Sequence, residues 1–175
     1  MARYYKIPIF VGGWGTCSKV PDAQAAYEKV LSAFLYYLSG TDITSGPGLL
    51  ENWTVLSYEQ LLIDYEIYTM MVDMLKSFPV TDESMGMDVT KKVGHEGHFL
   101  GQKHTIDHFK EMWQPVVTDG ATYQTWKASG SLSAVDHARA RAKEIIKTHQ
   151  VTPLPDDVRR EFARIIKEGE EKIPH

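Results

Sequence analysis

Apolar positions follow a strand pattern and then a helix pattern at the start of the chain. A short apolar run at residues 7–11 stops at a glycine pair, which is typical of a buried strand followed by a tight loop. From about residue 21 onward, apolar residues recur at helical spacing until Gly40, and a glycine favours the end of a helix. This stretch therefore predicts a strand, a glycine loop and a helix.

The same order of elements follows a second time. Residues 41–45 predict another short strand, which the sequence Gly-Pro-Gly at 46–48 would end. Ser57, with Gln60 three residues later, matches a capping box at the start of the next helix. Strands and helices in this alternation are typical of βα units with parallel strands. Since two parallel strands are normally buried within a larger sheet or barrel, the pattern predicts the end of a larger structure.

Only helical periodicity is found from about residue 82 onward. Two amphipathic helices are expected, separated by Pro153-Leu154-Pro155, with apolar stripes at Val135, Ala138, Ala142 and Ile145 and at Val158, Phe162, Ile165 and Ile166. We therefore predict an α/β fold in two parts. Residues 1–78 form βα units, and residues 79–175 form a helical C-terminal extension without further strands.

Composition and charge exclude several classes of protein. The 175 residues are 43% hydrophobic and 24% charged, as in a folded domain and unlike a disordered chain. The formal net charge is −4, and the pairs Lys91-Lys92 and Arg159-Arg160 are isolated rather than part of a basic stripe. No nucleic-acid partner is therefore expected.

The cellular location follows from the lone cysteine and from the apolar runs. Cys17 is the only cysteine, so an intramolecular disulfide cannot form, which suits a reducing compartment. No apolar run reaches the roughly 20 residues of a membrane-spanning helix, and the first residues lack the apolar core of a signal peptide. We expect a cytoplasmic protein without a membrane partner.

Two glycine loops, each carrying a tryptophan, follow the two predicted strands. The loop at residues 12–19 lacks the Lys-Ser/Thr ending of a phosphate-binding loop and the dinucleotide fingerprint. The loop at 46–53 occupies the equivalent position after the second strand, and such loops build the active sites of βα folds. Indole faces attract cations by about 0.5–2 kcal/mol, so Trp14 and Trp53 are candidates for binding a cation. The alternative is that both are core or interface residues.

Residues 94–109 hold a histidine-rich motif. Its histidines are His95, His98, His104 and His108, and the last two share a helix face. The spacing matches no standard zinc signature, so the sequence favours histidines with a structural role and predicts no metal site. Cys17 lacks a signature that would pair it with a base, so no catalytic side chain is predicted.

Several of these motifs resemble a known family. They are Val20 to Ala25, Gly40-Thr41-Asp42 through Gly48 to Glu51, Gly94 to Phe109 with Gly-His-Phe-Leu-Gly and His-Thr-Ile-Asp-His-Phe, Trp113-Gln114-Pro115, and Tyr123 to Trp126. Together they resemble the C-terminal region of the trimethylamine methyltransferase family, which includes enzymes acting on glycine betaine and related quaternary amines. The resemblance covers nearly the whole chain.

The resemblance implies a (β/α)8 TIM-type barrel of more than twice this length, with residues 1–78 as its last two βα units. Its activity would be methyl transfer from a tertiary or quaternary amine to the Co(I) of a corrinoid (cobalamin) carried by a separate protein. Cobalt would be the nucleophile, so no catalytic residue and no tightly bound cofactor are expected in this chain. The expected substrate-binding residues are Trp14, Glu51, Asn52 and Trp53.

The expected partners are the corrinoid protein, the methylated amine, and the missing N-terminal part of the barrel or a second copy of the chain. Members that use trimethylamine carry pyrrolysine, whereas this sequence has only standard residues. Either the chain acts on another amine or that residue lies outside it. A competing hypothesis is a non-catalytic helical interaction module left from a truncated gene.

Overall fold

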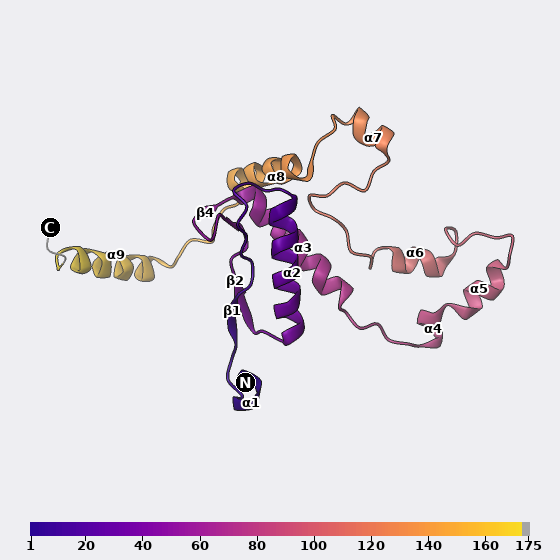
Figure 1. Ribbon diagram of the computed structural model, residues 1–175, viewed down its shortest axis with the longest axis horizontal. Helices are drawn as coiled ribbons and strands as arrows, with labels where there is room; N and C mark the ends of the chain where they lie inside the picture. The colour runs from indigo at the N-terminus through magenta and orange to yellow at the C-terminus, as the bar shows by residue number, and fades with distance from the viewer. Residues whose placement is uncertain (173–175) are drawn as a thin grey trace. The chain divides into compact units, whose positions relative to one another are not determined.

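The first part of the chain is built around the predicted pair of parallel strands (Figure 1). In this computed structural model, which describes residues 1–172, β1 (Phe10–Gly12) pairs with β2 (Ile43–Ser45), and Phe10 lies opposite Ile43. A short helix, α1 (Ala2–Tyr5), precedes β1. The strands are confirmed, but β1 begins later than the apolar run. Pro8 has no backbone N–H to contribute to a ladder, which favours a later start.

The helix between the strands is confirmed, and so is Gly40 as the residue that ends it. This helix, α2, spans Ala23–Ser39. The Asp22 side chain accepts a hydrogen bond from the backbone N–H of Ala25, and Gly40 adopts φ +74° at the other end. A left-handed conformation is readily available to glycine, so the chain can turn directly into β2.

The next helix, α3 (Tyr58–Met74), begins as predicted, but only half of its expected capping box is present. The Ser57 hydroxyl accepts a hydrogen bond from the backbone N–H of Gln60. The Gln60 side chain does not return to the Ser57 backbone, because it is buried and donates to Asp64 Oδ1 at 2.7 Å. The prediction of a reciprocal box was therefore wrong.

A second, antiparallel pair of strands was not predicted. β3 (Leu49–Leu50) pairs with β4 (Val55–Leu56), and a tight turn at residues 51–54 joins them. Each strand has only two residues, which is too short to show an alternating pattern. Among residues 57–172 the structure has helices and no strand, as predicted. These are α3 and then α4 (Asp82–Met85), α5 (Met87–Val93), α6 (Lys103–Phe109), α7 (Tyr123–Ala128), α8 (Ala134–Thr148) and α9 (Asp156–Glu170).

The chain divides into two compact units, residues 1–143 and 144–175, of which the second is described as far as residue 172. The predicted boundary between residues 78 and 79 stays a prediction. Mixed helices and strands confirm the α/β class. In the part of the chain that the structure describes, no helix is both long and apolar enough to cross a membrane.

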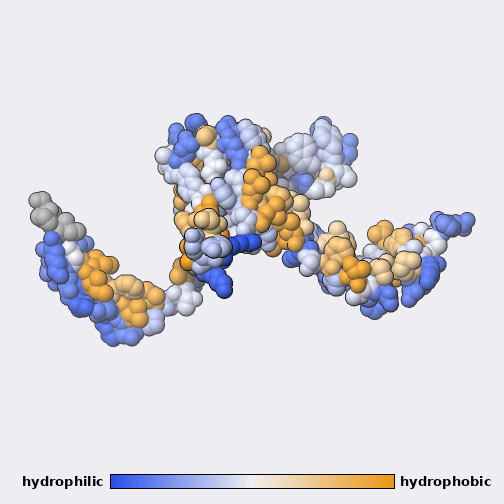
Figure 2. Space-filling model, turned by 60° about the horizontal axis from the view of Figure 1, so that its bottom comes forward, coloured by the Kyte–Doolittle hydropathy of each residue, from blue (hydrophilic) through white to orange (hydrophobic). Residues whose placement is uncertain are grey.

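A small hydrophobic cluster holds α2 and α3 against the loop that follows β1. Trp14, Ala33 and Met71 are its buried members, and Phe34 and Ile67 pack against them. By contrast, apolar side chains of the strands and of α2 reach the surface: Phe10 is 66% exposed, Ile43 59% and Leu35 66%. Figure 2 shows orange apolar patches between the polar side chains of this unit, and an apolar stripe opposite a blue face along α9.

Candidate functional site

The carboxyl ends of the two parallel strands bring the two glycine loops together. The Gly13 backbone N–H donates to the Ser45 carbonyl at 3.2 Å, which continues the strand pairing. Farther along, the N–H of Glu51 donates to the Ser18 carbonyl at 2.8 Å and that of Asn52 to the Thr16 carbonyl at 2.9 Å. The loops at 12–19 and 46–53 therefore form one surface at the position where βα folds bind ligands.

The Trp53 indole packs directly against glycines of both loops. A Cβ atom added at Gly12 would lie 2.8 Å from Trp53 Cη2, one at Gly15 3.0 Å from Nε1, and one at Gly46 2.7 Å from Cη2. Each distance is shorter than an ordinary van der Waals contact, so the three glycines permit this packing. Trp53 keeps 42% of its surface exposed, which leaves part of the indole accessible to a ligand.

A left-handed turn places Trp53 on the glycines. Glu51, Asn52 and Trp53 have φ values of +47°, +50° and +75°. Residues other than glycine rarely adopt this left-handed region. The backbone hydrogen bonds from Glu51 and Asn52 to the first loop hold the turn, and the Thr54 hydroxyl donates to the Glu51 carbonyl at 2.7 Å. Backbone outliers of this kind cluster at binding sites.

The polar side chains of this turn lie at the same surface. Asn52 Oδ1 accepts a hydrogen bond from the Cys17 thiol at 3.1 Å. The Glu51 carboxylate lies 3.4 Å from the Thr54 hydroxyl and stays partly exposed. Three of the four predicted substrate-binding residues, Glu51, Asn52 and Trp53, therefore occupy consecutive positions at the end of the second loop, in contact with the first loop.

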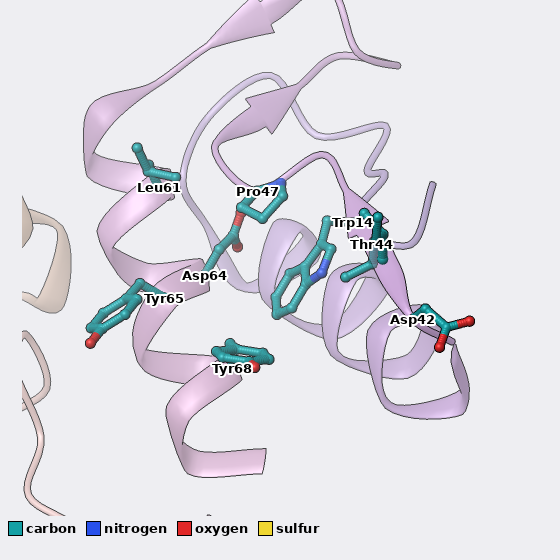
Figure 3. Close-up of a pocket in the computed structure, with 9 residues that line it drawn as sticks. Trp14, Asp42, Thr44, Pro47, Leu61, Asp64, Tyr65 and Tyr68 are labelled. Carbon is teal, nitrogen blue, oxygen red and sulfur yellow. The ribbon is translucent and has the colours of Figure 1, made fainter. Parts of the chain in front are cut away.

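Trp14, the fourth predicted residue, is buried instead. It is 1% exposed and belongs to the hydrophobic cluster, and its Nε1 atom has no hydrogen-bond partner among the described residues. Its indole also lines a pocket of about 460 Å3. Figure 3 shows the indole between β2 and α3, the helix that carries Tyr65 and Tyr68. Its role as a substrate-binding residue stays a prediction.

A buried ion pair supports the second glycine loop from the interior. Lys29 Nζ lies 2.8 Å from Asp64 Oδ2, and both side chains are fully buried. Asp64 Oδ2 also accepts the Gly48 N–H at 2.7 Å, while Lys29 donates to the Gly46 carbonyl at 3.4 Å. Burial raises the pKa of the Asp64 carboxyl, and its donors Lys29, Gly48 and Gln60 oppose that rise. The pair thus links α2 and α3 to the loop at 46–53, which carries Trp53.

The first glycine loop is held by Glu28 of α2. Its carboxylate accepts hydrogen bonds from the Thr16 hydroxyl at 2.6 Å, from the Cys17 N–H at 2.8 Å and from the Gln24 side chain at 2.9 Å. Stabilisation of the charged form by the Thr16 hydroxyl, followed by the other two donors, lowers the pKa of Glu28. This fixed negative charge lies on the helix side of the loop.

Sequence reasoning missed the buried charged residues. Lys29 lies at the centre of the buried face of α2, between Ala25 and Ala33, and a lysine on such a face was a signal for a buried partner. Glu66, which is 2% exposed, accepts hydrogen bonds from the backbone of residues 116–118. Nothing in its local pattern indicated a partner about 50 positions away.

The histidine-rich motif is only partly brought together. His104 and His108 lie side by side on α6 with ring centroids 4.5 Å apart, next to Glu83 of α4. His95 and His98 are exposed and do not belong to this group.

Comparison with known proteins identifies the relatives of the chain. The sequence model of the family described as trimethylamine methyltransferase (MTTB) matches residues 1–174. Trimethylamine methyltransferase MttB of Desulfitobacterium hafniense (strain DSM 10664 / DCB-2) is 33% identical over 172 residues, which are 98% of this chain and 35% of that protein. MttB of Methanosarcina barkeri (strain Fusaro / DSM 804) is 32% identical, over 97% of this chain and 34% of its own length.

A relative named for a different substrate matches at a similar identity over a slightly shorter stretch. Glycine betaine methyltransferase of Desulfitobacterium hafniense (strain Y51) is 34% identical over 160 residues, covering 90% of this chain and 33% of that protein. The chain therefore spans about a third of the length of the curated relatives it matches. Because the family model matches nearly every residue, the chain belongs to the trimethylamine methyltransferase family.

Proposed function

We propose that this chain is the C-terminal part of a cytoplasmic enzyme that moves a methyl group from a tertiary or quaternary amine to the Co(I) corrinoid of a partner protein. Residues 1–78 would be the last two βα units of a (β/α)8 barrel, and the helices that follow would extend it. The names of the relatives support a methylated amine as substrate, since they specify trimethylamine and glycine betaine.

The position of Trp53 carries the proposal. Its partly exposed indole lies across Gly12, Gly15 and Gly46 at the carboxyl ends of both parallel strands. A quaternary ammonium has no N–H to donate, so its affinity must come from cation–π contact and desolvation. An indole held rigidly against two loops offers such a face without a large cost in side-chain entropy.

Residues around Trp53 would complete the substrate site. The Glu51 carboxylate would attract the ammonium charge, and the Asn52 side chain would be a polar contact. Trp14 would contribute to the substrate site as one of the residues that line the neighbouring pocket.

The corrinoid supplies the nucleophile when its carrier protein is bound. A cobalt nucleophile supplied by the carrier protein fits the residues present here. The Cys17 thiol donates to the Asn52 amide oxygen, and not to a basic side chain that could activate it as a nucleophile. The work of this chain would be to orient the N-methyl group and to exclude water from it.

The exposed apolar side chains on the parallel strand pair support the need for a further part of the barrel or a second copy. Phe10 and Ile43, opposite each other in the parallel pair, are 66% and 59% exposed. Parallel strands are normally covered on both faces. We therefore expect self-association of the isolated chain, or stable binding to the N-terminal part of the barrel.

The experiment measures methyl transfer from a panel of methylated amines to cob(I)alamin. The 175-residue chain is supplied with the N-terminal two-thirds of a relative, and single variants of it are compared. Trp53→Leu should weaken binding of the amine by about 1–2 kcal/mol, which is roughly 5- to 30-fold. Cys17→Ser should leave the transfer largely unchanged. If Cys17→Ser abolishes methyl transfer while Trp53→Leu keeps full activity, the aromatic site is wrong and a thiol mechanism is supported instead.

A non-catalytic docking module is the second candidate, and α9 favours it. This helix contains no buried residue, and its apolar side chains Phe162 and Ile165 are each 52% exposed. Tight binding to the barrel part or to another protein without any methyl transfer would support this candidate over the enzyme.

A further inference from the structure

Two histidines of α6 and a glutamate of α4 lie close together in residues 79–112. His108 Nε2 lies 2.7 Å from Glu83 Oε1, and His104 Nε2 lies 3.7 Å from the same oxygen. Each residue offers one ligand atom, and the three atoms lie within 4.8 Å of one another. His104 and His108 are four residues apart on α6, so both rings project from one face of that helix.

Local structure sets the position of α4 next to His104. Thr81 and Ser84 form a reciprocal capping box around α4, the helix that carries Glu83. Gly86 ends this helix with φ +57°, and His104 Nε2 lies 2.9 Å from the Glu83 carbonyl oxygen. The two short helices therefore meet at the three ligand atoms.

We propose that Glu83, His104 and His108 bind one Zn2+ ion. Two imidazoles and one carboxylate are a common protein ligand set for zinc, and they leave a fourth position for water or another ligand. With metal–ligand bonds of about 2.0–2.2 Å, tetrahedral ligand atoms lie roughly 3.3–3.5 Å apart. Side-chain rotations would bring the three atoms to that spacing: His104 Nε2 would leave the Glu83 carbonyl oxygen, which lies 2.9 Å away, and zinc would take the place of the protons on the Nε2 atoms.

A fourth residue orients one of the ligands. His108 Nδ1 lies 2.8 Å from Glu111 Oε2. When Nε2 binds the metal, Nδ1–H donates to this carboxylate, which fixes the tautomer and the direction of the ring. Glu111 is thus a positioning residue. The imidazole ligands favour zinc over Mg2+ and Ca2+, which prefer oxygen.

The site would stabilise a segment with little hydrophobic support. Helices α4, α5 and α6 contain no buried residue, so apolar burial contributes little to their arrangement. A metal bound by α4 and α6 would link positions about 25 residues apart and would add its binding free energy to the folded form. The inference is independent of the amine site, which lies at the strand ends.

The test titrates the metal-free 175-residue chain with Zn2+ by isothermal titration calorimetry. One equivalent should bind, and binding should be lost in His104→Gln and in His108→Gln. His95→Gln is the matched control, because His95 is an exposed histidine of the same motif outside the group, and this variant should bind like the parent. Glu111→Gln should weaken binding by about 10- to 100-fold.

A second readout reports on the segment itself. Zn2+ should slow proteolysis between α4 and α6 in the parent and in His95→Gln, and should have no effect in His108→Gln. Circular dichroism checks that the variants keep the helix content of the parent. The proposal is overturned if the parent binds no Zn2+, or if binding and protection persist in both His104→Gln and His108→Gln.

Discussion

Replacing Lys29 with methionine removes the cation of a buried ion pair while keeping most of its bulk. Asp64 would then remain fully buried without its partner at 2.8 Å. Breaking a buried pair by removing one charge costs about 3–5 kcal/mol. Asp64 keeps the donors Gly48 and Gln60, so we expect a loss near the lower end of that range. Even this is a large share of the stability of an ordinary domain.

The chain offers a matched control within the same structure. Lys76 Nζ lies 2.9 Å from Asp73 Oδ1, nearly the same distance, but the Lys76 side chain is 66% exposed. Lys76→Met should therefore change the unfolding free energy by no more than about 1 kcal/mol. A Lys29→Met/Asp64→Asn double variant removes both charges and keeps an acceptor for the Gly48 N–H, so it should recover part of the loss.

Urea unfolding followed by tryptophan fluorescence measures these differences, and pH supplies a second test. Burial already raises the pKa of Asp64 above its usual value of 3.8, and loss of Lys29 raises it further. A raised carboxyl pKa lowers stability as pH increases through the interval between the unfolded and folded values. The effect of Lys29→Met should therefore shrink at acidic pH. Equal effects of Lys29→Met and Lys76→Met at pH 7 would refute the reasoning.

Three further variants test the packing of the site and of the chain beyond it. Gly46→Ala places a Cβ 2.7 Å from the Trp53 ring at a residue with φ +108°, so it should destabilise the fold by more than about 1 kcal/mol and shift the Trp53 emission. Trp14→Leu should cost about 2–4 kcal/mol of stability in thermal unfolding, because that indole is a buried member of the core. Glu66→Gln replaces the carboxylate that accepts hydrogen bonds from the Thr118 backbone and hydroxyl with a weaker acceptor. The free energy of unfolding should fall by about 1.5–3 kcal/mol. Amide exchange should become faster at Thr118 and stay unchanged at Trp53.

The parallel strands and long helices were predictable because their signals are local. Asp22 and Gly40 mark the two ends of α2 within one stretch of sequence, and the stripe of apolar residues between them needs no distant partner to be seen. The carboxyl-end rule for parallel strands likewise predicts equivalent positions for the two glycine loops.

The different surroundings of Trp14 and Trp53 were not predictable from the sequence. Both follow a strand within a glycine loop, yet Trp14 is buried among residues of α2 and α3, whereas Trp53 sits on the glycines of both loops. Long-range contacts decide these directions, and a single sequence does not contain them. The same holds for Glu83, which lies 21 and 25 positions before His104 and His108, a separation that matches no standard zinc signature.

The hydrogen bonds from α3 to the later chain have a consequence for how the family could vary in length. After α3 ends, the chain returns to the same helix, where Trp113 Nε1 donates to the Thr69 hydroxyl at 3.2 Å and Glu66 accepts the backbone of residues 116–118. Residues 76–112 thus form a long loop that leaves α3 at one end and is hydrogen-bonded to α3 again at the other. The entropy of closing a loop grows only with the logarithm of its length, so doubling such a loop costs about 0.6 kcal/mol. Insertions in this stretch, outside α4, α6 and Glu111, should therefore be tolerated far better than insertions at residues 113–118, where the chain is fastened.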